Sequence, residues 1–428
     1  MAAGILPTVS SRSDPHLGLM RILHTADWHL GRTLYHKSRY EEFQIFLDWL
    51  IQTIRDRAID VLLIAGDVFD TTAPSNRAQE LYYDFLSQLS ATGCRHIVVT
   101  AGNHDSPTFL DAPKRILKAL DVHVIGKVPD RIEDEVLLLR DRDGDPELIV
   151  CAVPYLRDRD IRKSEAGESL EAKEQKLREG IEDHYTSVAT IAVGVRDTLK
   201  VPVPIVAMGH LYTAGGQTVE GDGVRNLYVG NLAHVESKIF SDSFDYVALG
   251  HLHVPQKVND SDSIRFSGSP IPMGFGEAAQ QKYVNLVQWN ENHLEVELIP
   301  VPKIQRLESI QGDWPHIVNR LEELKRSEES VWIEVAYRGS DLIPNLKEKV
   351  DPIIAGSMLE ALRVTDVQTG QAILARGHST ESLKELNPID IFRMYLDQKD
   401  LLEEQRKRLE ETYHEILFQI QSIDSEAE

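Results

Sequence analysis

The chain has 428 residues and a formal net charge of −22, with 42% of its residues hydrophobic and 27% charged. This length predicts two or three domains with enough apolar material for a real core, and no apolar run approaches the ~18 residues that a membrane-spanning helix needs. The acidic balance argues against a protein that coats nucleic acid by electrostatics alone, but not against an enzyme that meets DNA at a local cationic site.

Residues 1–19 are polar and turn-forming, and they lack the basic start and the sustained apolar segment of a secretory signal. We expect a flexible extension here, with Met20 as the natural start because it stands directly before the first strand-like run. The two cysteines, Cys94 and Cys151, cannot make a disulfide framework, and both lie beside apolar runs. Buried thiols and a reducing compartment, by default the cytoplasm, are therefore expected.

Residues 20–302 alternate short apolar runs with longer amphipathic stretches, which predicts an α/β domain. The runs are aliphatic or β-branched and end at glycine or proline, as buried strands do. Apolar residues three and four apart over 40–59 and 78–93 indicate surface helices. Residues 160–198 begin with a dense charge run, from which we expect an exposed helical insertion with a solvated face.

The pattern changes after residue 302. Residues 303–378 predict a small α+β unit, with strands near 331–337 and 362–368 and a partly helical stretch between them. Residues 379–428 predict two amphipathic helices, the first capped by Asn387 with Pro388 in its first turn. These helices either pack on their own domain or offer an apolar face to a partner.

Five apolar runs of the α/β region end in the same way, with a small residue followed by a side chain that can bind a metal. Ligands in open α/β folds gather beyond the carboxyl ends of strands, so these five ends could converge. Taken singly, each residue has an ordinary explanation as a cap or turn residue. Their order and spacing together are hard to obtain by accident and predict a metal site. The side chains are Asp27, His29, Asp67, Asn103, His104, Asp105, His210, His251 and His253.

The last two of these residues, His251 and His253, stand two apart at the end of the run YVALGHLH. Because residues two apart in a strand share a face, we expect both imidazoles to aim at the same place.

The motifs D-x-H, G-D, G-N-H-D, G-H and G-H-x-H, in this order, resemble those of the calcineurin-like metallophosphoesterase superfamily. Within it the chain is similar to the SbcD family of nucleases over nearly everything after residue 20. The segments that carry this likeness are ILHTADWHLGRTL, LLIAGDVFDTTAPSNRAQELYYDFL, YVALGHLHVPQ, FSGSPIPMGFGE and ELNPIDIFRMYL. The resemblance implies a four-layer α/β/β/α sandwich with a small α+β capping domain and C-terminal helices.

The resemblance also implies two divalent ions bridged by one carboxylate, that of Asp67. One ion would be held by Asp27, His29, Asp67 and His253, and the other by Asp67, Asn103, His210 and His251. This set is too rich in imidazole for Mg²⁺. The resemblance favours Mn²⁺, and Fe or Zn stay open. His104 would not be a ligand but would protonate the leaving oxygen, with Asp105 orienting its ring.

The family likeness implies an ATP-linked exonuclease on duplex DNA ends that also cuts single-stranded or hairpin DNA, in DNA repair, recombination and replication. Residues 303–378 would cap the active site and contact DNA. The terminal helices would bind an SbcC-like, SMC-type ATPase, and the catalytic domains would form a homodimer. No residue is predicted to bind substrate, since Arg32 and Arg39 are as plausible on the surface as on a phosphate.

Two alternatives belong to other functional classes. A small-molecule or nucleotide phosphodiesterase or phosphatase of the same superfamily gives no reason for the apolar terminal helices. A scaffold that has kept the fold and lost the chemistry would be expected to lack ligands, and this sequence has the full set.

Overall fold

The computed structural model describes residues 20–161, 170–199, 201–211, 213, 237–290, 293–341, 343–367, 396 and 413. The expected N-terminal extension over residues 1–19 lies outside the described residues. So do the expected C-terminal helices over 379–428, apart from two isolated positions. Within the described part of the chain, no helix is long and apolar enough to cross a membrane.

The first sheet has six strands in the order β14-β13-β1-β4-β5-β6. Its strands β1, β4, β5 and β6 are parallel, while β13 runs antiparallel to β1 and β14 antiparallel to β13. The strands are β1 (Arg21–Thr25), β4 (Val61–Ala65), β5 (His96–Thr100), β6 (Val122–Ile125), β13 (Tyr283–Asn290) and β14 (His293–Pro300). The helices that connect them are α1 (Tyr40–Asp56), α2 (Asn76–Leu89), α3 (Pro107–Asp111), α4 (Lys114–Leu117) and η1 (Lys118–Leu120).

The second sheet also has six strands, in the order β11-β12-β10-β9-β8-β7. Its centre is parallel, from β12 through β10 and β9 to β8, and its two outer strands are antiparallel to their neighbours. The strands are β7 (Val136–Arg140), β8 (Pro146–Ala152), β9 (Ile205–His210), β10 (Tyr246–Gly250), β11 (Gln256–Val258) and β12 (Ser261–Phe266). The helices around it are η2 (Ile132–Glu135), α5 (Asp158–Ile161), α6 (Leu170–Thr198) and η3 (Ser237–Ile239), and a further short helix, η4 (Phe275–Glu277), precedes β13.

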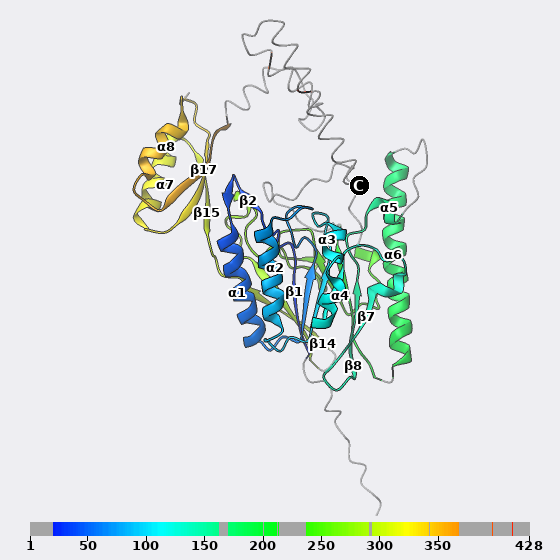
Figure 1. The fold of residues 1–428 in the computed structure, drawn as a ribbon. Coiled ribbons are helices and arrows are strands. Elements are labelled where there is room, and N and C mark those ends of the chain that lie inside the picture. Colours follow the sequence, from blue (N-terminus) through cyan, green and yellow to red (C-terminus); the bar gives the residue numbers. More distant parts are fainter. Residues whose placement is uncertain are drawn as a thin grey trace, which may run out of the picture.

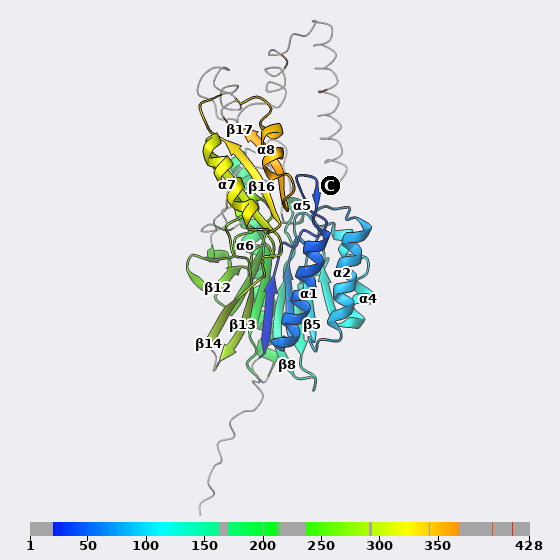
Figure 2. The ribbon, with the colours of Figure 1, turned by 90° about the vertical axis from the view of Figure 1, so that its left-hand side faces the viewer.

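Apolar side chains on both faces of each sheet build the core in layers. In β4, Leu62 and Ile64 pack with the apolar stripes of α1 and α2, whereas Val61 and Leu63 pack with strands of the second sheet. One apolar strand contributes to the core on both faces of its sheet, because successive side chains of a strand point to opposite faces. With α6 on the far side, the expected four-layer α/β/β/α sandwich is confirmed (Figures 1 and 2).

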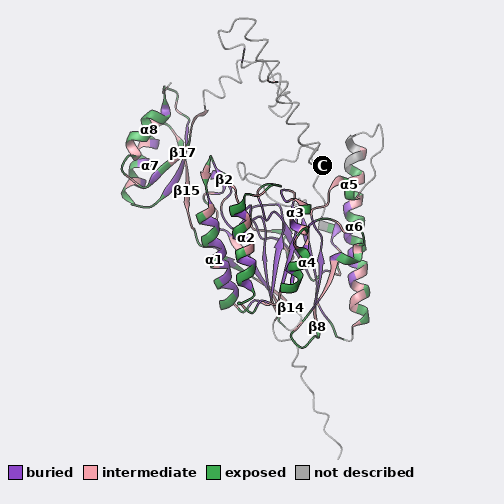
Figure 3. Ribbon diagram, in the orientation of Figure 1, coloured by how far each residue is buried: buried purple, intermediate pink, exposed green. Residues whose placement is uncertain are grey.

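Helix α6 corrects the prediction of an exposed insertion over residues 160–198. Figure 3 shows α6 against the second sheet, with exposed residues along its outer side. The hydroxyl of Tyr185 donates to the backbone oxygen of Met208 at 3.3 Å, which ties the helix to β9. The prediction was wrong because it followed the charged residues at the start of the segment and overlooked the apolar residues at helical spacing that come later in it. Its buried members are Ile181, Tyr185, Val188, Ala189 and Ala192.

A third, smaller sheet has three parallel strands in the order β15-β16-β17, with α7 and α8 packed on one of its faces. Strands and helices alternate, so the unit expected to be α+β is more specifically a parallel βαβαβ arrangement. Its elements are β15 (Arg306–Gly312), α7 (Trp314–Arg326), β16 (Val331–Tyr337), α8 (Leu346–Ile354) and β17 (Leu359–Asp366). A short hairpin of β2 (Thr33–Leu34) and β3 (Lys37–Ser38) stands near it, as Figure 1 shows for β2.

Candidate metal centre

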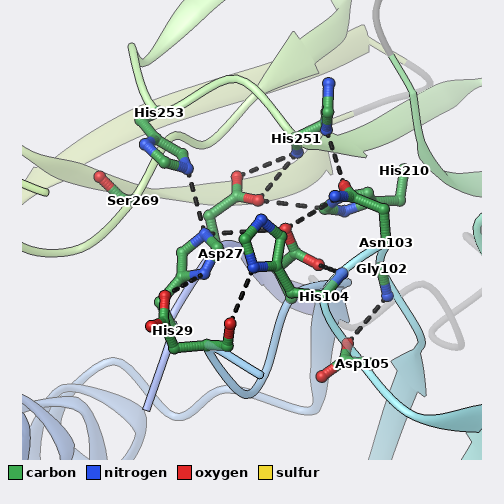
Figure 4. A network of polar contacts seen from close by, with 12 residues as sticks. Asp27, His29, Gly102, Asn103, His104, Asp105, His210, His251, His253 and Ser269 are labelled. Atoms are coloured by element: carbon green, nitrogen blue, oxygen red, sulfur yellow. Dashed lines mark hydrogen bonds and ion pairs between the residues drawn. The ribbon is translucent and has the colours of Figure 1, made fainter. Parts of the chain in front are cut away.

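The predicted site residues lie close together, as Figure 4 shows for those that it labels. Strands β1, β4 and β5 of the first sheet and β9 and β10 of the second all lead into the same pocket, so both sheets contribute to it. The side chains brought together there are Asp27, His29, Asp67, Asn103, His104, Asp105, His210, His251 and His253. All of them are buried except Asn103, which is partly buried.

The backbone at four of these residues is left-handed. Asp27, His29 and Asp67 have φ values of 53°, 48° and 50°, and His251 has a φ of 97°. Such values are uncommon for residues with a side chain, and they cluster at functional sites where the surroundings hold them. They also correct the prediction for His251 and His253. β10 ends at Gly250, so a turn rather than strand alternation directs these imidazoles.

Two glycines beside the site residues leave room for the side chains to meet. A Cβ on Gly66, whose φ is +85°, would lie 2.1 Å from His210 Nδ1. A Cβ on Gly102 would lie 2.1 Å from Asp67 Oδ1 and 2.4 Å from the Asp67 backbone nitrogen. No real Cβ is accommodated at such distances, so the small residue at each strand end is a steric requirement of the pocket.

The first set of donors is built around His29 and His253. Their Nε2 atoms face each other at 3.1 Å. Behind them, His29 Nδ1 lies 3.4 Å from Asp70 Oδ1, and His253 Nδ1 lies 3.4 Å from Glu277 Oε1. A carboxylate at Nδ1 favours the proton there, which leaves two Nε2 lone pairs directed at each other. Lone pairs so placed repel each other unless a proton or a metal ion lies between them, and Asp27 completes a group that could hold an ion.

The second set is built around His210. Its Nδ1 donates to the backbone oxygen of Ala65 at 3.0 Å, so the lone pair is on Nε2. That Nε2 faces Asp67 Oδ2 at 3.2 Å and Asn103 Oδ1 at 3.1 Å. His251 Nδ1 lies 3.0 Å from the same Asn103 oxygen. An imidazole nitrogen and a carboxylate at this distance need a proton or a metal ion between them, and the mixture of nitrogen and oxygen donors suits a transition-metal dication.

Asp67 stands between the two sets. Its Oδ2 lies 3.6 Å from His29 Nε2 and 3.2 Å from His210 Nε2. Its Oδ1 accepts the backbone N–H of His104 at 2.8 Å, which fixes the carboxylate plane. One oxygen thus faces both imidazole groups, as in a carboxylate that bridges two ions through a single oxygen. The residues present fit a pair of divalent ions.

Burial dominates the electrostatics of the pocket. It raises the pKa of Asp27 to about 6, because His210 offsets the desolvation only in part. It lowers the pKa of His29 to about 4 and that of His251 to about 3, so both imidazoles are neutral at pH 7. Burial also disfavours charge on His210, but Asp67 and Asp27 overcome this and raise its pKa to about 9. Without metal, a proton on His210 therefore balances the buried carboxylates.

His104 and Asp105 are arranged differently from the prediction. His104 Nδ1 donates to the backbone oxygen of Asp70 at 2.8 Å. The Asp105 carboxylate accepts three backbone N–H groups, from Val68 (3.2 Å), Phe69 (2.9 Å) and Gly102 (2.8 Å). The expectation that Asp105 orients the His104 ring directly is wrong, because the backbone oxygen of Asp70 holds His104 Nδ1 while the Asp105 carboxylate binds the three peptide groups. Asp105 instead ties together the loops that follow β4 and β5.

Sequence reasoning missed the carboxylates behind the histidines, Asp70 and Glu277. Glu277 is buried, and its Oε2 pairs with Lys282 Nζ at 2.5 Å and accepts the backbone N–H of Met273 at 2.9 Å. Burial opposes charge on Asp70, yet His29 and Arg32 lower its pKa to about 2. Both residues lie in segments that resemble the family. Neither directly follows an apolar run, so the pattern that identified the candidate ligands did not include them.

The two arginines considered as phosphate contacts have protein partners. Arg32 Nη1 pairs with Asp70 Oδ1 at 3.0 Å. Arg39 is buried, binds Glu42 through two nitrogens at 2.8 Å each and donates to the backbone oxygen of Pro272 at 2.7 Å. Arg39 is therefore structural.

Comparisons with known proteins show which families the chain resembles. A model of the calcineurin-like phosphoesterases matches residues 20–255, and one described as the type 5 capsule protein repressor C-terminal domain matches residues 303–400. The SbcD subunit of the nuclease SbcCD from Escherichia coli K12 is 36% identical over 397 residues, which cover 92% of this chain and 97% of the relative. The protein of the same description from Bacillus subtilis is 37% identical over 275 residues, 63% of this chain and 66% of its own.

Among solved structures, a dimetal phosphatase from Danio rerio aligns with 66% of this chain and 97% of its own. The identity is 12% and the TM-score 0.39, which is too low to support an inference.

Metal binding should release protons and strengthen as the pH rises. The raised pKa of His210, about 9, means that the metal-free protein carries a proton that a metal must displace. The apparent affinity for Mn²⁺ should therefore increase between pH 6.5 and 8.5, by up to about tenfold per pH unit for each proton displaced. Calorimetric titration in two buffers of different ionisation enthalpy measures the proton count. Affinity that is independent of pH over this range would contradict the arrangement.

Proposed function

The chain belongs to the calcineurin-like phosphoesterases and, among them, to the SbcD family of nucleases, and on this basis we propose that it is the metal-dependent nuclease subunit of an SbcC–SbcD-type complex. It hydrolyses phosphodiester bonds in DNA, as an ATP-linked exonuclease at duplex ends and as an endonuclease on single-stranded or hairpin DNA. Its role is in DNA repair, recombination and replication. The observation that carries the proposal is the single Asp67 oxygen facing two imidazole donor sets.

The ligands divide between two ions, which we propose to be Mn²⁺. Asp27, His29, Asp67 and His253 would hold one ion, and Asp67, Asn103, His210 and His251 would hold the other. When bound, two such ions offset the charge of the phosphate and make hydroxide available near neutral pH. Asp70 and Glu277 keep the His29 and His253 rings oriented, as outer-shell carboxylates do at metal sites.

His104 is the proposed general acid. Its Nδ1–H is held by the backbone oxygen of Asp70, and its ring meets that of His29 edge-on at 4.7 Å between centroids. Protonated on both nitrogens, it donates from Nε2 to the oxygen that leaves phosphorus. Asp105 supports this indirectly, because it fixes the loop that carries His104.

DNA as substrate, an SbcC-like ATPase as partner and a homodimer are proposals that rest on family membership and on the likeness of residues 303–400 to the second family model. The division into a nuclease domain over 20–302, a capping unit over 303–378 and partner-binding helices over 379–428 is proposed on the same basis. The acidic chain fits a subunit that relies on its partner for much of its DNA affinity. A cytoplasmic location stays a prediction. The small-molecule alternative is not favoured by relatives described as nucleases.

The capping proposal has support in the contacts of the β2–β3 hairpin, which follows His29 by only four residues. Lys37 Nζ pairs with Glu360 Oε2 at 2.5 Å and lies 5.6 Å from the centre of the Trp332 ring. Arg363 Nη1 lies 3.1 Å from the hydroxyl of Tyr35. A small apolar cluster lies beneath these contacts: Leu34, Phe275, Leu307 and Trp332. The third sheet is thus attached beside the loop that carries His29.

The nuclease proposal is tested with the full chain, Mn²⁺ and end-labelled linear duplex DNA, with and without an SbcC-like partner and ATP. Asp67→Ala should abolish cutting and weaken both ions. His104→Ala should keep two equivalents of metal and lose turnover by about 10²–10⁴-fold. Cleavage of a small phosphodiester but not of DNA would move the protein to the general phosphodiesterases. Loss of metal in His104→Ala would refute its role as a non-ligand.

The capping proposal makes a separate prediction. Trp332→Ala removes the aromatic face under Lys37 and should lower DNA cleavage by about tenfold through misplaced substrate, while hydrolysis of a small phosphodiester changes little. Glu322→Ala, an exposed position on the opposite side of the third sheet, is the matched control. If Trp332→Ala lowered the cleavage of DNA and of the small phosphodiester equally, the contact between Lys37 and Trp332 would support the loop that carries His29 and would not position DNA.

A further inference from the structure

A second cluster of metal-binding side chains lies at the other end of the first sheet. His96 is the first residue of β5, His123 is the second residue of β6, and Asp121 directly precedes β6. One ligand atom from each of the three lies within 4.8 Å of the others. His96 opens the five-residue strand whose far end leads to Asn103, so the strand alone separates the cluster from the metal centre by about 13 Å, at ~3.3 Å for each of four residue steps.

The hydrogen bonding of His96 leaves one ring nitrogen without a partner. Its Nε2 lies 2.8 Å from the backbone oxygen of Arg140, and because a carbonyl only accepts, Nε2 carries the proton. Its Nδ1 is buried and has no hydrogen-bond partner among the described residues. In the neutral ring this atom is a buried lone pair, and in the protonated ring it is a buried unpaired N–H. Either form leaves Nδ1 unsatisfied, whereas a metal ion would satisfy it.

The surroundings of His96 are those of a ligating imidazole. Metal-binding histidines usually donate their second ring N–H to a carbonyl or a carboxylate, which fixes the tautomer. His96 has both kinds of group at Nε2, because Glu147 Oε1 lies 3.5 Å from it in addition to the Arg140 oxygen. Arg95 holds Glu147 in place through a contact of 2.5 Å.

The two other members are placed to join His96. His123 pairs in register with Val98 of β5, and its ring centroid lies 6.2 Å from that of His96. Asp121 is exposed, so its carboxylate can adjust to an ion. His123 also lines a surface cleft of about 440 Å³.

We propose that His96, Asp121 and His123 form a third, peripheral site for a transition-metal dication of the Zn²⁺ class. Two imidazoles and one carboxylate favour Zn²⁺, Co²⁺ or Ni²⁺ over Mg²⁺ or Ca²⁺, which take oxygen ligands. Water completes the coordination on the exposed side. The ion joins the amino end of β5 to β6, an edge strand of the first sheet, and stabilises that edge.

The proposal is tested by counting bound metal in the full chain after equilibrium dialysis against Zn²⁺ and removal of free ion. The wild type should hold three equivalents, and His96→Gln and His123→Gln should each hold two. His293→Gln, at an exposed histidine of β14, is the matched control and should hold three. Asp67→Ala weakens both ions of the metal centre and leaves the peripheral site unchanged. Adding His123→Gln to Asp67→Ala should therefore remove one further equivalent of Zn²⁺, the one bound at the peripheral site.

Folding and activity are checked in the same variants. Unchanged circular dichroism and Mn²⁺-dependent cleavage would show that His123→Gln leaves the metal centre intact, so that a lost equivalent belongs to the peripheral site. The Zn²⁺-dependent rise in Tm should be smaller in His96→Gln and His123→Gln than in the wild type. Equal metal counts in the wild type and in both variants would overturn the proposal, as would the same loss in His293→Gln.

Discussion

The pocket at the strand ends depends on one constraint: buried lone pairs and carboxylates face one another and need positive charge between them. His29 and His253 present Nε2 atoms 3.1 Å apart, and His210 presents Nε2 to Asp67 at 3.2 Å. Uncompensated buried charge costs several kcal/mol, so such a pocket is stable only with cations or with shifted protons. Asp67 and Asp27 raise the pKa of His210 to about 9, so without metal a proton on His210 supplies the positive charge that the carboxylates need.

The fold provides this pocket by ending strands of two sheets at one place. Left-handed backbone at Asp27, His29, Asp67 and His251 turns the chain sharply after the strands and points the side chains inward. Strain of this kind costs of order 1–3 kcal/mol per residue and persists only where the surroundings hold it. Here the surroundings include the sheets themselves and the Asp105 carboxylate, which binds three peptide N–H groups.

The candidate ligands could be predicted to lie together because each follows the end of an apolar run, where parallel strands bring distant residues together. The carboxylates behind them could not, since Asp70 and Glu277 reach His29 and His253 through tertiary packing that leaves no periodic trace. Helix α6 was misjudged for a related reason. Its early charges dominate the sequence, while its later stripe around Tyr185 packs on the second sheet.

The same reasoning explains the error at Asp105. Its position after His104 suggested a side-chain partner, but in the fold the nearest donors are backbone groups of two loops, and the backbone oxygen of Asp70 holds His104 instead. Sequence neighbours at tight turns often point apart, so adjacency in a motif does not specify contact. The roles of the residues therefore had to come from their geometry, whereas the types of residue at the site followed from the motifs.

The central claim is that Asp67 is shared by two metal ions. The most direct measurement is anomalous diffraction at the manganese edge from crystals of the full chain soaked in Mn²⁺. The account predicts two anomalous peaks on either side of the Asp67 carboxylate, one beside His29 and His253 and the other beside His210 and His251. A single peak at saturating Mn²⁺, or two peaks that do not share Asp67, would contradict it.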